Sequence, residues 1–541
     1  MKSIRFNFKS YIALTFLLPF VFVLIFTGLD DSVLQVDEGG DTFISTTILK
    51  YGFPMHSDGL NKTMLFADIF DGVFIYRTWL PYYLQSISLN FLGNNTFAAR
   101  LPFALAGFFS IFCLYHLAIR LTQEKSIAVF SSTLLATCIP ALLYFRTSRY
   151  IAIPILLTPI LLLFYIDIFE KKKWSPIPIT ITSIIFFHTM YVEFAGLIMG
   201  ILTHLFIYRK EVQTINLKKI KTPAVITMVI CLPWLLFVPS ISKQITAFYT
   251  STSPFIDASY LGYFKHFFGF LFQINNYLFP FILVPFLLLN LLKKFDRWIS
   301  LLLISIFFIL LTASLHSIPL LQYIAACIPI LSLLLGWLIF HLFKGSIIKQ
   351  YIFLSLLIFS NFIHVGPFIP VKQILLNQKP EFQSSLYFQG VYGTFIREIQ
   401  FKSNFFQYWR ELANPYQGPL DKIVQFFETH GKNRETCYID NELESLAFYT
   451  GFKMIHNNDL NFNSKPDWIV LRGDHWDIFS TEKISPLQTK LQFILANNDY
   501  EKIILNAPVK RVNNSYEVQI HLFQSPTSTD NVYIYRRSGI I

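Results

Sequence analysis

Long apolar segments recur along the first two thirds of the chain, separated by short clusters of charge. A helix needs about 20 apolar residues to cross a bilayer, so this pattern predicts a polytopic α-helical membrane protein with about eleven transmembrane helices. The predicted spans are 11–29, 98–119, 126–143, 151–169, 174–190, 194–208, 222–239, 276–292, 298–313, 319–342 and 350–366. The pair at 174–190 and 194–208 is short for two crossings.

Lysine and arginine in the short connections predict the orientation of these helices. If the N-terminus is cytoplasmic, the six cytoplasmic segments hold 18 basic residues, whereas the short outer turns hold only Arg146 and Arg149. Cytoplasmic loops of membrane proteins carry an excess of Lys and Arg. The sequence therefore predicts a multi-pass cell-membrane (plasma or inner membrane) protein, and an odd number of spans puts its C-terminus outside.

Composition agrees with a membrane protein. Hydrophobic residues make up 53% of the 541 residues and charged residues only 14%, against about 25% charged in a soluble domain. The net charge of +11 would suit a nucleic-acid partner, but its distribution fits membrane topology instead. The five cysteines have no zinc-type spacing and are interpreted as packing residues.

The chain divides into a membrane module, 1–366, and an extracytoplasmic region, 367–541. In the second, "TCYIDNELESLAFYTGFKMI" predicts a strand, a helix and a strand, and "PDWIVLRG" and "NVYIYRR" predict two more strands. This indicates a small α/β domain. It has no Gly-rich phosphate loop and no nucleophile elbow, so we expect a structural or acceptor-guiding role there rather than catalysis.

An acidic cluster, "LQVDEGGDTF", follows the first apolar segment and opens a long outer loop, 30–97. Carboxylates held at a bilayer edge can act as a general base or bind a divalent metal ion, and the sequence leaves both roles open. We favour Asp37 and then Glu38 for chemistry, and interpret Asp41 as a helix cap. The two glycines between them predict a close turn of the backbone.

The same loop carries an ordered series of motifs that resembles the GT-C glycosyltransferases, specifically the protein O-mannosyltransferase and aminoarabinose-transferase-like group. The resemblance is clearest over residues 30–170 and does not extend to the C-terminal domain. The matching residues are Asp37-Glu38, Arg77, Pro81-Tyr82-Tyr83, Leu92-Gly93 and Ala99-Arg100-Leu101-Pro102.

The resemblance implies transfer of a sugar from a polyprenyl-phosphate carrier to a protein, lipid or glycan acceptor at the outer face of the membrane. By analogy, Asp37 is the catalytic carboxylate that deprotonates the acceptor, with Glu38 beside it. Arg77 matches the basic residue that contacts the carrier phosphate, a role that suits a planar guanidinium. Tyr82 belongs to the predicted substrate-binding set.

A second group of candidates lies at the outer ends of later spans. Arg146 and Arg149 run against the positive-inside bias, which favours them as phosphate ligands. The family often has an acid after this turn, where this chain has Ile151, so we expect Glu193 to supply a second carboxylate. The other predicted substrate-binding residues are Tyr150, His188, His266 and Tyr323.

Two other classes of function compete with the enzyme. A transporter or flippase would place ionisable groups at the span midpoints and show two related halves, whereas these midpoints are nearly free of charge and no internal repeat is visible. A non-catalytic scaffold, or an O-antigen ligase or polymerase, would share the lipid-linked donor but would need a large late outer loop with its own arginines, whereas the long outer loop comes first here. The sequence therefore favours the glycosyltransferase.

Overall fold

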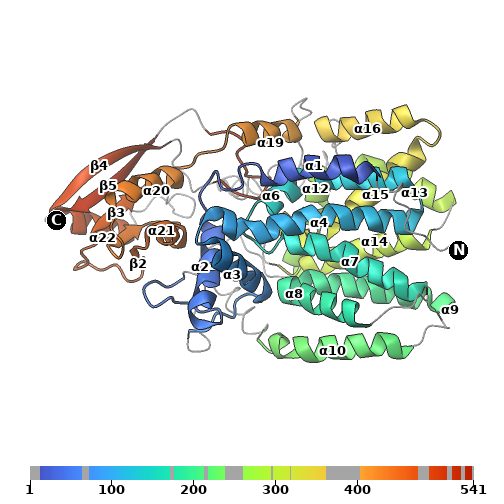
Figure 1. Cartoon of the computed structure of the whole chain (residues 1–541), viewed down its shortest axis with the longest axis horizontal. Helices are drawn as coiled ribbons and strands as arrows, with labels where there is room; N and C mark the ends of the chain where they lie inside the picture. Colours follow the sequence, from blue (N-terminus) through green and yellow to red (C-terminus); the bar gives the residue numbers. More distant parts are fainter. Residues whose placement is uncertain are drawn as a thin grey trace.

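The computed structural model describes residues 12–63, 72–170, 176–212, 217–237, 260–293, 296–316, 319–360, 363, 403–472, 486–507, 514–525 and 530–538. A bundle of apolar helices occupies one end of the molecule and a β-sheet the other, with two shorter helices between them (Figure 1). We refer to the end of the bundle nearest the sheet as the sheet end. The predicted boundary at 366/367 lies outside the described residues.

The bundle contains helices that are apolar around most of their circumference, as expected for buried or lipid-facing helices. They are α1 (Ile12–Phe26), α4 (Thr96–Thr122), α5 (Lys125–Ala136), α6 (Ile139–Phe145), α7 (Ala152–Phe169), α8 (Pro176–Ile207), α10 (Leu217–Leu235), α12 (Tyr260–Tyr277), α13 (Val284–Lys293), α14 (Arg297–Ala313), α15 (Cys327–Leu342) and α16 (Ile347–Phe359). The short charged helix α9 (Arg209–Val212) and the 3₁₀ turns η2 (Phe281–Leu283) and η3 (Leu321–Ile324) connect them.

Two predicted spans are bent rather than straight. Helices α5 and α6 meet at 62°, and α12 and α13 meet at 88°. Each break is followed closely by a proline, Pro140 in the first turn of α6 and Pro280 before η2. Proline has no N–H to donate and its ring clashes with the preceding turn, so it favours the end or a bend of the helix before it.

Helix α8 reverses direction at Met190, whose φ of −152° and ψ of 87° are not helical. A straight helix of 32 residues would be about 48 Å long. However, Phe169, which precedes α8 in the chain, packs with its ring 5.9 Å from that of His204 near the other end of α8. The two arms of α8 therefore run antiparallel, as expected for the predicted spans 174–190 and 194–208.

By length and composition, three described helices, α4, α7 and α8, are long and apolar enough to cross a membrane, or up to five spans if each bent pair counts as one. Helix α8 reaches that length only when its two arms are counted together. The remaining apolar helices α1, α14, α15 and α16, and the apolar part of α10, Lys221–Leu235, are shorter. The helical bundle agrees with a membrane protein, while eleven crossings remain a prediction.

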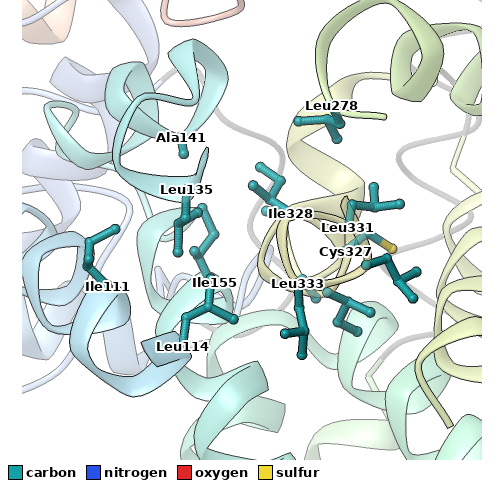
Figure 2. Close-up of a cluster of buried hydrophobic side chains, with 14 of the residues drawn as sticks. Ile111, Leu114, Leu135, Ala141, Ile155, Leu278, Cys327, Ile328, Leu331 and Leu333 are labelled. Atoms are coloured by element: carbon teal, nitrogen blue, oxygen red, sulfur yellow. The ribbon is translucent and has the colours of Figure 1, made fainter. Parts of the chain in front are cut away.

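The bundle core lies among α4, α5, α7 and α15 (Figure 2). Ile111, Leu135, Ile155 and Ile328 are each fully buried in it. Helices α5 and α15 approach closely because Gly336 has no side chain: a Cβ there would lie 2.4 Å from the Ser131 Oγ. Close packing of this kind fixes how the sheet ends of these helices are arranged.

Helices α2 (Val36–Tyr51) and α3 (Leu80–Leu92) lie between bundle and sheet. The C-terminal region contains α19 (Asn404–Ala413), α20 (Pro419–His430), α21 (Leu443–Thr450) and α22 (Pro486–Ala496). The strands are β1 (Thr436–Ile439), β2 (Lys453–Ile455), β3 (Trp468–Leu471), β4 (Tyr500–Ala507) and β5 (Asp530–Arg537). They form a sheet in the order β2-β1-β3-β5-β4. β1 pairs in parallel with β2 and β3, and β5 pairs antiparallel with β3 and β4. The strand, helix and strand expected for 436–455 are β1, α21 and β2.

The sheet region docks on α2 through Gly39. A Cβ at this position would lie 2.0 Å from the Ser445 Oγ and 2.7 Å from the Ser445 backbone nitrogen on α21. The predicted turn at the two glycines is therefore wrong, because both lie inside α2. What Gly39 provides is a close helix–helix approach, and this fixes the first turn of α2 against the C-terminal region.

Candidate active site

Helix α2 carries the acidic cluster on its first turns. Gln35 caps the helix, its side chain accepting from the Asp37 N–H, and Glu38 completes a capping box. Negative side chains are stabilised at a helix N-terminus by the partial positive charge of its free N–H groups. Asp37 and Asp41 are one turn apart and point to the same side of the helix.

Two arginines bracket this carboxylate pair. Arg149 Nη1 lies 3.0 Å from Asp37 Oδ2, and its Nε lies 3.2 Å from Asp41 Oδ2. Arg77 Nη1 lies 2.7 Å from Asp41 Oδ1, which also accepts a hydrogen bond from the Tyr82 hydroxyl at 3.2 Å. The interpretation of Asp41 as a cap is therefore wrong: it is buried within α2 and joins the two arginines.

Accessibility separates these four charged groups. The side chain of Asp37 is 39% exposed and that of Arg77 24% exposed, whereas that of Arg149 is 2% exposed. Tyr150 lies between the two guanidinium groups, with its ring centre 5.8 Å from Arg77 and 5.5 Å from Arg149. Asp37 and Arg77 are therefore the members that a substrate can reach.

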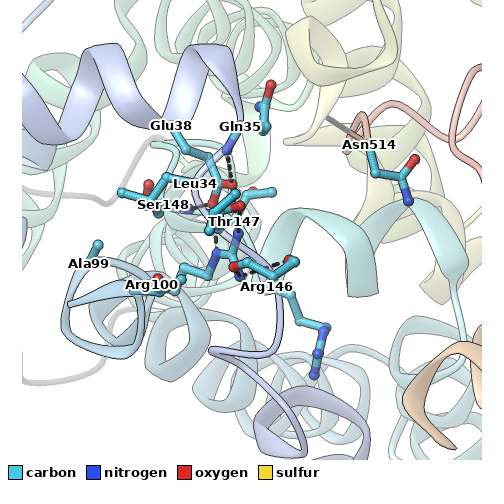
Figure 3. Close-up of polar contacts among 12 residues, drawn as sticks. Leu34, Gln35, Glu38, Ala99, Arg100, Arg146, Thr147, Ser148 and Asn514 are labelled. Atoms are coloured by element: carbon cyan, nitrogen blue, oxygen red, sulfur yellow. Dashed lines mark hydrogen bonds and ion pairs between the residues drawn. The ribbon is translucent and has the colours of Figure 1, made fainter. Parts of the chain in front are cut away.

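Glu38 is buried and points toward Arg100 rather than toward Arg149 (Figure 3). Arg100 donates to both of its oxygens, from Nε at 2.9 Å and from Nη2 at 2.8 Å. Glu38 also accepts from the backbone N–H of Ser148, at 2.7 Å, and of Gln35, at 3.2 Å. Arg100 belongs to the "ARLP" motif, so one buried pair ties the start of α2 to α4 and to the turn that carries Arg149.

The side chain of Arg146 packs against the C-terminal end of α1. Its guanidinium donates to the carbonyl oxygens of Ile25 at 2.9 Å, Thr27 at 2.6 Å and Gly28 at 2.7 Å. The last carbonyls of a helix have no partner within the helix, and a cation near them is favourable. In this structure Arg146 therefore serves to close the end of α1.

A segment that the sequence did not single out completes the cluster. The Tyr516 hydroxyl donates to Asp37 Oδ2 at 2.7 Å, and its ring centre lies 5.3 Å from the Arg149 guanidinium. Next to it, buried Glu517 accepts from the Tyr144 hydroxyl at 3.1 Å. Residues 516–522, YEVQIHL, alternate apolar and polar positions, a pattern typical of a half-buried strand, although the structure forms turns there. Nothing in this pattern assigned the segment to a site in the membrane module.

The balance of charges keeps Asp37 ionised. Burial alone would raise the pKa of this carboxyl, but Arg149, Arg77 and the Tyr516 hydroxyl together outweigh it and lower the pKa below its ordinary value of 3.8. Glu517 behaves in the opposite way, since burial raises its pKa to about 8. At neutral pH the cluster therefore holds an ionised Asp37 beside a largely protonated Glu517.

The other predicted site residues lie on the bundle helices. Glu193 is fully buried after the reversal of α8, where its Oε1 is 3.4 Å from the Ala326 backbone nitrogen and its Oε2 has no hydrogen-bond partner among the described residues. His188 packs on Phe187, with ring centres 5.2 Å apart.

His266 lies on α12 and Tyr323 on η3, both toward the sheet end of the bundle. The His266 Nδ1 is 3.4 Å from the Ser314 carbonyl oxygen. The Tyr323 ring stacks on His316 with centres 3.9 Å apart. Its neighbour Gln322 reaches the cluster itself, because the Gln322 Oε1 lies 3.3 Å from the Tyr516 hydroxyl.

The Asp37-Glu38 pair does not fit a divalent metal ion in this arrangement. Both oxygens of Glu38 are occupied by Arg100, and Asp37 faces Arg149. Over the described ranges no group of three or more His, Cys, Asp or Glu side chains has metal-binding geometry. We therefore derive no chemistry through a metal.

Comparison with known proteins supports the class that the sequence predicts. Residues 77–237 match the family described as dolichyl-phosphate-mannose-protein mannosyltransferase. This range contains Arg77, Arg100 and Arg149. A search of curated proteins finds no significant match.

Two solved structures align with this chain over nearly its full length. ArnT from Cupriavidus metallidurans bound to undecaprenyl phosphate is similar with a TM-score of 0.58 and 15% identity, over 97% of this chain and 98% of that one. The chain has the GT-C fold. The apo form of the same ArnT aligns with a TM-score of 0.54 and 15% identity, over 96% and 97% of the two chains. The family match and the GT-C fold together confirm the predicted class, a glycosyltransferase of the GT-C type.

Proposed function

We propose that this GT-C protein transfers a sugar from a polyprenyl-phosphate carrier to an acceptor at the outer face of the membrane, with Asp37 as the catalytic base. The observation that carries the proposal is a partly exposed, ionised carboxylate flanked by two arginines. The similarity to an ArnT structure that holds undecaprenyl phosphate supports a polyprenyl-phosphate donor.

In the proposed reaction, Asp37 takes a proton from an acceptor hydroxyl or amine. The acceptor atom forms a bond to the anomeric carbon of the sugar, and the bond from that carbon to the phosphate oxygen breaks. The electron pair leaves with the polyprenyl phosphate, whose growing negative charge is stabilised by a guanidinium group. Arg77 suits this role because it is the more exposed of the two cluster arginines.

Other predicted site residues receive supporting roles in this scheme. We assign Arg149 to holding Asp37 and Asp41 in place, because its side chain is almost completely buried. Glu38 and Arg146 are held by buried or backbone partners and position the turns around the cluster. Tyr82 and Tyr150 fix Asp41 and the two arginines.

We propose that the sheet end faces outward. The cluster and the C-terminal sheet lie at the same end of the bundle (Figure 1), and 18 basic residues against two in the short loops favour a cytoplasmic N-terminus. In this arrangement the chain crosses the cell membrane eleven times and the C-terminal α/β domain is extracytoplasmic.

Replacing Arg77 with alanine tests the phosphate role. We expect the KM for the lipid-linked donor to rise about 10–100-fold, since a charge-assisted contact to the phosphate is lost. The variant Arg77→Lys should lie between alanine and wild type, because it keeps the charge but loses the planar fork. The exposed Arg410→Ala serves as a control. An unchanged KM for the donor in Arg77→Ala would exclude this role.

The pH dependence of transfer follows from the lowered pKa of Asp37. The base form exists above this pKa and is lost as the pH falls through it, so we expect the acidic limb of the kcat/KM profile to lie below the ordinary value of 3.8. Returning acid-exposed protein to pH 7 and assaying it again separates titration from unfolding. An acidic limb above that value would contradict the assignment of the base.

A further inference from the structure

The segment 514–525 reaches back from the C-terminal region into the helical bundle. Asn514 closes it as a compact loop by donating to the Leu522 carbonyl oxygen at 2.7 Å and accepting from the Leu522 N–H at 2.8 Å. Tyr516 and Val518 are buried in the same core cluster as the bundle helices. The segment is therefore packed against the bundle, and it carries Tyr516 to the cluster in a defined position.

A cavity of about 100 Å³ beside the cluster lies against the same segment. Gln35, Arg146 and Asn514 all contribute to its lining (Figure 3). Glu38 and Tyr516 line it as well. The segment around Gln35 and the C-terminal region therefore line this cavity together.

The hydroxyl of Tyr516 has one proton and two acceptors in range. Asp37 Oδ2 is at 2.7 Å and Gln322 Oε1 at 3.3 Å. The ionised carboxylate is the stronger acceptor and the nearer one, so it takes the proton. The ring is held in turn by Arg149 and by Tyr144, whose ring centre is 6.2 Å away. These contacts of the Tyr516 ring with Arg149 and Tyr144 therefore keep its hydroxyl directed toward Asp37.

We propose that Tyr516 is a positioning residue of the transfer reaction, which aims the Asp37 carboxylate at the acceptor and so makes the C-terminal region part of the active site. This inference rests on the proposed function of Asp37. It also gives the C-terminal region a role in catalysis that the sequence did not predict.

The charged and titratable groups that face Asp37 come from four elements of the structure. They are Asp41 on α2, Tyr76 and Arg77 before α3, Arg149 before α7, and Tyr516 and Glu517 in the C-terminal segment. Tyr516 donates a hydrogen bond that favours the ionised form of Asp37. Removing its hydroxyl should therefore raise the pKa of Asp37 and move the acidic limb of the pH profile upward.

The test is Tyr516→Phe in the full-length protein, which keeps the ring and removes only the hydroxyl. We expect kcat to fall about 10–100-fold, the usual effect of losing a hydrogen bond to a charged group. The KM for the donor should stay within about twofold, and the acidic limb should shift upward. The control is Tyr408→Phe, because the Tyr408 hydroxyl is equally buried in the same region but donates to the Leu24 carbonyl oxygen.

The outcomes separate the two proposals. If Tyr516→Phe matches wild type in kcat and pH profile while Asp37→Asn is inactive, Tyr516 has no positioning role and the proposed function stands. If Tyr516→Phe and Tyr408→Phe lose activity equally without a shift in pH profile, the effect is structural and the inference fails. If Asp37→Asn itself retains normal transfer, the proposed function fails as well.

Discussion

Replacing Asp37 with asparagine should lower the rate of sugar transfer by about 10²–10⁴-fold, the usual cost of losing a general base. The substitution keeps the size of the side chain, and the Tyr516 hydroxyl can still donate to the amide oxygen. It removes the negative charge that faces Arg149 and the ability to accept a proton. Transfer would be measured with purified protein in lipid vesicles and polyprenyl-phosphate sugars.

A matched control for this variant is Asp30→Asn. Asp30 is an exposed carboxylate in the connection between α1 and α2, shortly before Asp37 in the chain, so its loss should leave transfer unchanged. Binding of the lipid-linked donor to Asp37→Asn should persist, since the phosphate is assigned to Arg77. Transfer by Asp37→Asn at close to the wild-type rate would remove Asp37 from the mechanism.

The largest effect on stability is expected from Glu38→Gln. The pair with Arg100 is buried on both sides, with side chains 7% and 2% exposed. Removing one charge of a buried pair leaves the other without compensation, at a cost of about 3–5 kcal/mol. A reversible denaturant titration in detergent micelles would measure the free energy of unfolding.

The comparison for this prediction is Glu211→Gln. Glu211 pairs with Arg297 at 2.6 Å, but its side chain is 48% exposed, and exposed pairs contribute about 0–1 kcal/mol. Replacing both members of the buried pair, as Glu38→Leu with Arg100→Met, should recover part of the loss because no charge is then left unpaired. Equal destabilisation by Glu38→Gln and Glu211→Gln would refute the anchoring role of the buried pair.

Part of this site could be predicted from sequence because its members occur in one outer loop and one short turn. The acidic cluster and the family resemblance brought Asp37, Arg77 and Tyr82 into the candidate set, the outer turn at 144–150 added Arg149 and Tyr150, and the structure brings these five together. Their common origin at the ends of apolar segments explains this success. Residues at the same end of neighbouring helices are close in space wherever they lie in the sequence.

The roles within the cluster depended on contacts that no local pattern reveals. Asp41 looked like a cap but lies inside a helix, where it joins Arg77 and Arg149. Glu38 stands next to Asp37 in sequence, but the helical turn of about 100° per residue directs it toward Arg100 instead. Tyr516 is far from Asp37 in the chain and lies in an alternating apolar and polar segment that is typical of a strand, not of a site, so only the folded structure relates them.

The central claim is tested most directly by following the fate of the donor. Purified protein in vesicles would receive a panel of polyprenyl-phosphate sugars with a membrane extract as the source of acceptors, and free polyprenyl phosphate and glycosylated product would be quantified by mass spectrometry. The account predicts that wild-type protein releases polyprenyl phosphate in step with product, and that Asp37→Asn releases neither. Movement of the intact lipid-linked sugar across the vesicle membrane without cleavage would contradict it and identify a flippase.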